Sequence, residues 1–227
     1  SYTEGNMTEA EEHYRASLRA NRKLGNLEGI NGALINLGAC RFDVGDLEGA
    51  MGLWQEAAEM AAQLGYKQRE AVLHNNLGSL FEVQGRLEEA EERYRLSLSV
   101  RREIDDRSGQ ANALHNLGRL AAGRGEAEKS RRKLTQALEV FIQIEEPAGE
   151  AHVRSSLARL LAGQGNEDDA RSEAHAALEL ALKLGSRSDI LGSLFTVALL
   201  HERAGELVRA ADLASQVAEA AAGSMEP

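Results

Sequence analysis

The sequence contains few of the residues that interrupt helices or build sheets. Only two of its 227 residues are proline and 4% are aromatic, and β-branched residues are sparse, whereas Ala, Leu, Glu and Arg are frequent. Proline breaks helices, and β-branched and aromatic residues favour strands. The composition therefore predicts an all-α protein and excludes a sheet protein.

Other absences narrow the function. One cysteine cannot form an intrachain disulfide, so nothing requires an oxidising compartment and we expect the cytoplasm. No apolar run approaches the roughly 18 residues of a membrane span. The net charge of -10 argues against the basic face that nucleic acid or an anionic membrane requires. We expect neither nucleic acid nor membrane as a partner.

Sequence motifs of enzymes are also missing. The Gly-x-Gly segments at Gly123–Gly125 and Gly163–Gly165 follow no predicted strand, and His201 lacks the second histidine of a zinc-protease helix. The six histidines share no register, although His115 and His152 are placed to approach each other on adjacent helices. We therefore expect no enzyme activity, no catalytic residue, no cofactor and no metal site.

The most informative feature is an internal repeat with a period of 40 residues. One marker is a triplet that begins as Asn-Leu-Gly and weakens toward the end of the chain, at residues 36–38, 76–78, 116–118, 156–158 and 196–198. A second marker is a glycine followed five residues on by a small residue, at Gly5, Gly45, Gly85, Gly125, Gly165 and Gly205. Two independent markers with one spacing indicate a repeat array.

Each period has the pattern of two antiparallel helices. Apolar residues around Leu37 follow an i, i+3, i+4, i+7 series, and a second series surrounds Trp54. Gly45 lies between them and is the type of residue that ends a helix in a left-handed conformation. We predict about eleven helices in a single domain over residues 1–227: a lone second helix at 6–24 and pairs at 27–64, 67–104, 107–144, 147–184 and 187–222.

These residues resemble the tetratricopeptide repeat family, which has Leu-Gly in its first helix and Ala-x-x-x-aromatic in its second. The second motif occurs as Ala10 to Tyr14, Ala50 to Trp54 and Ala90 to Tyr94. The usual repeat has about 34 residues and a closing proline. The longer period without that proline is similar to repeats of kinesin light chains and of bacterial signalling proteins. The resemblance implies a right-handed superhelical solenoid that binds protein or peptide.

Small residues recur where paired helices should lie closest, as at Gly38 and Ala50. A large side chain there would force the backbones apart, so we expect Gly78→Leu to destabilise the array. The aromatic position of the second helix becomes smaller along the chain, through Tyr14, Trp54, Tyr94, Leu134, Ala174 and Ala214. We expect the last two pairs to pack differently from the others.

A helical rotation of about 100° per residue places certain first-helix positions opposite the packing stripe. In the family that arc lines a concave groove, which gives the candidate residues Asn36, Asn75, Asn76, His115, Asn116, Arg119, Ser155, Ser156 and Arg159. Asparagines would bind the backbone of an extended peptide, and Arg119 and Arg159 would hold an acidic residue over the third and fourth pairs. The alternative is that the asparagines bond neighbouring helices and the arginines are solvated.

The two ends of the sequence look uncapped. Residues 6–24 form a second helix without its first, and the predicted helix at about 206–222 still carries an apolar stripe. We therefore expect a fragment of a longer protein, either an adaptor or the sensor region of a larger signalling protein. The alternative function is homo-oligomerisation through the uncapped ends.

Overall fold

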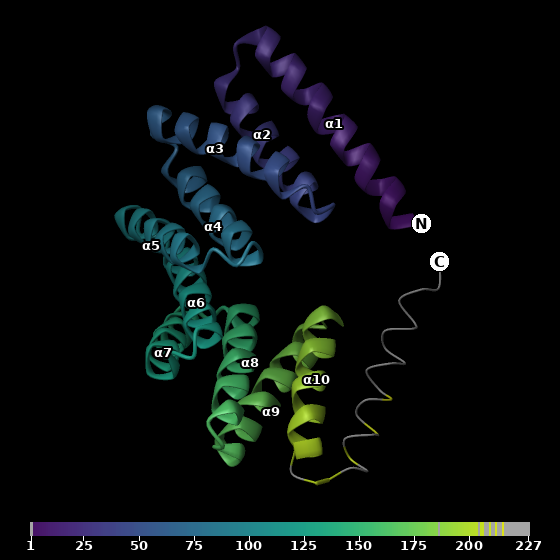
Figure 1. The fold of residues 1–227 in the computed structure, drawn as a ribbon, viewed down its shortest axis with the longest axis vertical. Helices are drawn as coiled ribbons and strands as arrows, with labels where there is room; N and C mark the ends of the chain where they lie inside the picture. Colours follow the sequence, from purple (N-terminus) through teal and green to yellow (C-terminus); the bar gives the residue numbers. More distant parts are fainter. Residues whose placement is uncertain are drawn as a thin grey trace. The chain divides into compact units, whose positions relative to one another are not determined.

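The computed structural model describes residues 2–185, 187–203, 205, 206, 209, 212 and 215. This part of the chain contains ten helices and no strand (Figure 1), and within each of its two units consecutive helices pack against each other. The helices are α1 (Tyr2–Leu24), α2 (Leu27–Asp43), α3 (Leu47–Leu64), α4 (Lys67–Val83), α5 (Leu87–Glu103), α6 (Arg107–Gly123), α7 (Ala127–Gln143), α8 (Pro147–Gly163), α9 (Glu167–Leu184) and α10 (Arg187–Arg203).

The chain divides into two compact units, Ser1–Asp106 and Arg107–Pro227. In the first unit α2 pairs with α3 and α4 with α5, and α1 packs on α2. In the second unit α6 pairs with α7 and α8 with α9, and α10 packs on α9. First helices also contact each other there, α6 with α8 and α8 with α10. That the whole chain is a single domain remains a prediction.

Left-handed residues end the helices at regular intervals. The backbone φ is positive at the predicted turn residues Gly45, Gly85, Gly125 and Gly165, with φ between 73° and 81°. Glycines of positive φ also stand at the turns between pairs, at Gly25, Gly65 and Gly185, but the equivalent positions hold Asp105 and Glu145, each with φ of 53°. The backbone therefore repeats every twenty residues, which is half the sequence period.

The first helix is longer than the sequence pattern predicted. We placed its start after Gly5, in register with the turn glycines, but α1 begins at Tyr2 and continues through Gly5. One glycine inside a helix costs only about 1 kcal/mol and does not by itself end the helix. The predicted final helix at 206–222 lies mostly outside the described residues.

Glycines of the first helices lie directly against large side chains of the second helices. A Cβ at Gly38 would come 2.3 Å from Nε1 of Trp54, and a Cβ at Gly118 would come 2.8 Å from Cδ2 of Leu134. The indole of Trp54 also donates a hydrogen bond to the carbonyl of Ile35 at 3.0 Å. Absence of a side chain at these glycines is what allows each pair to close, as the sequence predicted.

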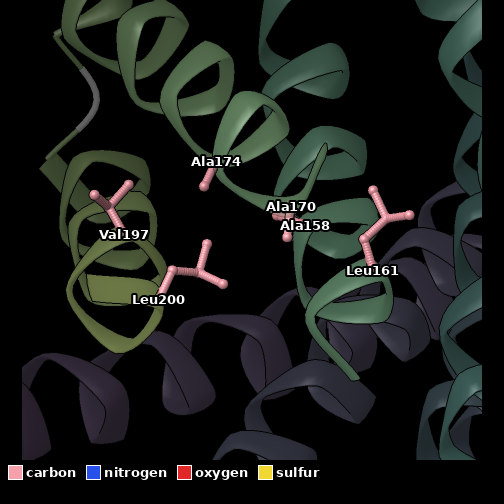
Figure 2. Close-up of a cluster of buried hydrophobic side chains, with 6 residues drawn as sticks. All are labelled: Ala158, Leu161, Ala170, Ala174, Val197 and Leu200. Atoms are coloured by element: carbon pink, nitrogen blue, oxygen red, sulfur yellow. The ribbon is translucent and has the colours of Figure 1, made fainter. Parts of the chain in front are cut away.

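The fourth pair packs by a different rule. Ala158 of α8 and Ala174 of α9 are both fully buried and take the places that glycine and a large residue hold in earlier pairs. They belong to a buried cluster with side chains from α8, α9 and α10 (Figure 2), namely Ala158, Leu161, Ala170, Ala174, Val197 and Leu200. In this pair two alanines therefore occupy the positions that a glycine and a large residue occupy in the earlier pairs. Ala214, the last member of the series, lies outside the described residues.

Polar bridges cross the interior of the first two pairs at one equivalent point. The side-chain amide of Asn31 donates to the carbonyl of Ala57 at 2.6 Å, and the hydroxyl of Ser97 donates to the carbonyl of Ala71 at 2.8 Å. The two bonds are forty residues apart, and the donor changes from the first helix to the second. Both donors are buried, so each bond satisfies a polar group that would otherwise lose water.

Candidate functional site

The second unit carries a depression of about 210 Å³ that is lined by three first helices. Its walls come from α6 (His115, Arg119), α8 (Ala151, His152, Ser155, Ser156, Arg159) and α10 (Gly192, Ser193, Thr196). Five candidate residues from the sequence therefore meet here: His115, Arg119, Ser155, Ser156 and Arg159. They come from α6 and α8, whose contact along the first-helix face brings positions forty residues apart together.

The centre of this depression is a small hydrogen-bonded cluster. Nε2 of His115 lies 2.8 Å from the hydroxyl oxygen of Ser156, and Nη2 of Arg159 donates to the same oxygen at 3.4 Å. Ser156 is 7% exposed, while Arg119 and Arg159 are exposed. The serine thus fixes the imidazole and one guanidinium at the base of the depression, and the charged groups remain open to solvent.

The depression is electropositive. The pKa of His115 is lowered to about 4, first by burial and then by the positive charges of Arg119, His152 and Arg159. The pKa of Arg159 is also lowered, first by burial and then by the charge of Arg119. The described lining contains no aspartate or glutamate. An anion entering this site would meet two guanidinium groups.

A depression of about 400 Å³ in the first unit has a different character. It is lined by residues of α1, α2 and α4 and by the turn between α1 and α2, including Tyr14, Ser17, Asn21, Asn26, Glu28, Asn36 and Arg69. Arg69 donates to the carbonyl of Glu28 at 2.8 Å and to its carboxylate at 2.9 Å. Its charge is therefore matched within the protein, and the surface offered by Asn36 is polar but not strongly positive.

The predicted row of amides and hydroxyls is uneven. Asn36 is exposed, Asn76 and Asn116 are half-buried, and Ser156 and Thr196 are buried. Asn75, Asn76 and Asn116 are not among the lining residues of either depression. Thr196 donates its hydroxyl hydrogen to the carbonyl of Gly192 at 3.0 Å, within its own helix. The row is most accessible at its N-terminal end.

Sequence reasoning missed several residues of these depressions. Ser193 belongs to the second unit's site, and Tyr14 and Arg69 to that of the first, whereas Thr196 was placed in the predicted row and His152 beside His115 without being chosen as candidates. Ser193 carried a signal, because its position in the other repeats is apolar, as Ala33, Leu73, Ala113 and Val153. Phe195, next to the lining residue Thr196, is 63% exposed and adds an apolar group to α10.

Within the described residues no group of three or more His, Cys, Asp or Glu side chains is placed to hold a metal ion. No described helix combines the length and the apolar character that crossing a bilayer requires.

Two overlapping segments, residues 29–102 and 68–143, match the model of the tetratricopeptide repeat family, and together they span half of the chain. The chain therefore belongs to the tetratricopeptide repeat family. This confirms the family inferred from the spacing of the glycines and of the Ala-x-x-x-aromatic motif. No protein of curated function matches the sequence.

Solved structures of similar fold cover most of the chain. BtubC (BKLC) from P. vanneervenii matches with a TM-score of 0.80 at 20% identity, over 97% of this chain and 94% of that one. A putative kinesin light chain with TPR-like repeats from Podosopora anserina matches with a TM-score of 0.64 at 17% identity, over 86% and 96%. The quorum sensor NprR from B. thuringiensis matches at 0.73 and 15%, over 97% and 62%. At these identities the likeness shows the fold, and it confirms the predicted all-α solenoid class.

Proposed function

We propose that this chain is a binding scaffold for protein or extended peptide, and not an enzyme. The observation that carries the proposal is the first-helix face of the second unit, where His115, Arg119, Ser155, Ser156 and Arg159 line one depression open to solvent. The partner carries an acidic side chain that Arg119 and Arg159 hold by charge-assisted hydrogen bonds. The amides that bind its backbone are Asn36 and Asn76 in the first unit and Asn116 in the second.

A role as an adaptor or as the sensor region of a larger signalling protein follows from the same proposal. Stacked helical repeats create extended concave surfaces that bind partners, and the NprR structure of similar fold is a quorum sensor. One scaffold carries many functions, so the partner is defined by the chemistry of the groove and not by the fold. That chemistry consists of amides on the first helices and an electropositive depression in the second unit.

Affinity capture with matched variants tests the proposal. Asn76→Ala with Asn116→Ala removes one amide from each unit, and Gln55→Ala with Gln136→Ala removes two exposed amides from the second helices α3 and α7. A partner captured by the wild type should bind about tenfold more weakly to the first variant and equally well to the second. Equal partner affinity for both variants, with a lower unfolding midpoint for the first, would mean that the asparagines serve only the fold.

Sedimentation distinguishes the alternative function. A chain that stays monomeric over a wide concentration range leaves the groove as the working surface. A stable dimer that the Asn76→Ala and Asn116→Ala substitutions leave unchanged would favour homo-oligomerisation through the ends of the repeat array.

A further inference from the structure

We propose that the first-helix face of α10 binds an apolar side chain of the partner, next to the depression that receives the partner's acidic residue. The partner segment is thereby defined as one in which an acidic and an apolar side chain lie a few residues apart. This rests on the proposed function and names the partner chemistry that the same site selects. The observations that carry it are a change of residue type at three matched positions and an exposed aromatic ring at one of them.

The same three positions of the first helices carry polar side chains on α6 and α8 and none on α10. On α6 they hold Asn112, His115 and Arg119, and on α8 they hold His152, Ser155 and Arg159. On α10 they hold Gly192, Phe195 and Leu199. Because α8 and α10 contact each other, the face changes from polar to apolar between neighbouring helices of one unit.

Phe195 is the exposed member of the apolar set. It is 63% exposed, whereas its equivalents on α6 and α8 are half-buried. Single apolar residues on a protein surface are ordinary, so the surroundings of the ring decide its meaning. Phe195 stands beside Thr196 and one turn after Gly192, both of which line the depression. Leu199, one turn later and half-buried, extends the apolar surface along the helix.

Gly192 keeps the surface between the depression and the ring clear. It is exposed, and a Cβ built on it would meet nothing within 4 Å, so close packing does not require a glycine here. Glycine weakens the interior of a helix, and packing offers nothing in return at this position. A longer side chain would stand between the lining of the depression and Phe195, which follows one turn later on the same face.

The separation of α8 and α10 sets the spacing within the partner. Packed helices lie about 8 to 10 Å apart, and an extended chain advances about 3.3 Å per residue. An acidic residue held by Arg159 on α8 is therefore about three residues from the apolar residue that contacts Phe195 on α10. Arg159 attracts the carboxylate, and the apolar contact distinguishes this segment from other acidic ones.

Synthetic peptides test the apolar contact on the intact chain. One Gly-Ser peptide carries a single glutamate, two others add a leucine three residues after or before it, and a fourth carries the leucine alone. Nuclear magnetic resonance titration of the backbone amides measures each affinity. We expect one of the two combined peptides to bind at least about tenfold more tightly than the glutamate peptide, because part of the leucine leaves water. The amide signals of Phe195 and Leu199 should shift with that peptide and not with the glutamate peptide.

Substitutions on α10 locate the contact. Phe195→Ser should reduce the affinity for the combined peptide to that for the glutamate peptide and leave the glutamate peptide unaffected. Gly192→Gln should have the same effect by obstructing the surface, although it improves the helix propensity. The matched control is Ile142→Ser on the second helix α7, which removes an apolar residue that is 48% exposed and should change neither affinity. If Phe195→Ser lowers the unfolding midpoint, Gly192→Gln provides the comparison.

The outcomes separate this inference from the proposed function. Equal affinity of the glutamate peptide and both combined peptides would overturn the apolar contact and leave the proposed function intact. A Phe195→Ser chain that loses the glutamate peptide as strongly as the combined one would also overturn it, since the ring would then support the depression and not contact the partner. No saturable response to any of the peptides would contradict the proposed function as well.

Discussion

Gly78 of α4 lies directly against the ring of Tyr94 on α5, so close that a Cβ at Gly78 would come 2.6 Å from Cε1 of the tyrosine. Tyr94 cannot retreat easily, because it is fully buried and its hydroxyl donates to the carboxylate of Glu82 at 2.8 Å. The absence of a side chain at Gly78 therefore leaves the space that the ring of Tyr94 occupies.

Gly78→Leu should therefore destabilise the first unit by about 3 kcal/mol through overpacking. The matched control is Gly52→Ala on α3, where an added Cβ meets nothing within 4 Å. This substitution should raise stability by about 0.5 to 1 kcal/mol through helix propensity. Chemical denaturation followed by circular dichroism measures both, and a Gly78→Leu chain as stable as the wild type would contradict the packing described here.

The contact between a glycine and a large side chain can be introduced into the fourth pair by substitution. Ala174→Leu should destabilise the second unit because Ala158 occupies the space that Gly118 leaves for Leu134 in the third pair. Adding Ala158→Gly recreates the Gly118 and Leu134 combination. We expect the double variant to be more stable than the sum of the single effects by about 1 to 2 kcal/mol, measured as a double-mutant cycle. Additive effects would show that the two positions do not share one space.

Glu145 stands at a turn with a backbone φ of 53°, where glycine occurs in most other turns. A side chain in this left-handed region is strained by about 1 to 2 kcal/mol. Glu145→Gly should relieve that strain and, after the added entropy of the unfolded chain, stabilise the second unit by about 1 kcal/mol. Glu139→Gly, at an exposed position inside α7, is the control and should destabilise by a similar amount.

The depressed pKa of His115 makes stability depend on pH. The folded value is about 4 and the ordinary value 6.5, so on acidification the unfolded chain takes up this proton first. The stabilising contribution is complete above the ordinary value and is lost as the pH falls toward the folded value. Between about pH 7 and about pH 5 in phosphate-free buffer, the loss amounts to at most about 2 kcal/mol.

Urea unfolding at the two pH values measures this contribution. The wild type should lose more stability on acidification than His115→Gln does, and His13→Gln, at an exposed position on α1, should behave as the wild type. An equal acid loss in the wild type and in His115→Gln would show that the histidine is not buried in the neutral form.

The sequence predicted those features of the fold that have local causes. Gly45 and Gly85 end helices because they adopt a positive φ, and Gly38 and Ala50 lie where helices meet, so each of them leaves a mark in its own repeat. Asp105 and Glu145 were not recognised as turn residues, because neither residue type demands a left-handed backbone. The extension of α1 through Gly5 was missed for a related reason, since glycine permits a turn without imposing one.

The candidate site was predictable only as rows on a helix face. Helical rotation placed His115, Ser155 and Arg159 on one helix face, and the structure brings them into one depression. Ser156 is hydrogen-bonded to His115, which is 41 residues away in the chain, and no local pattern carries that information. Ser193 entered the lining through the packing of α10 on α8, which is likewise a property of the assembled unit.

The left-handed residues described above recur twice as often as the sequence motif. The backbone geometry is therefore the same at the end of every helix, whereas the side chains distinguish the first helix of each pair from the second. A duplication or loss of forty residues would preserve both the spacing of the turns and the alternation of first and second helices. An insertion or deletion of twenty residues would keep the spacing of the turns. It would also place each downstream first helix at a second-helix position, and each second helix at a first-helix position.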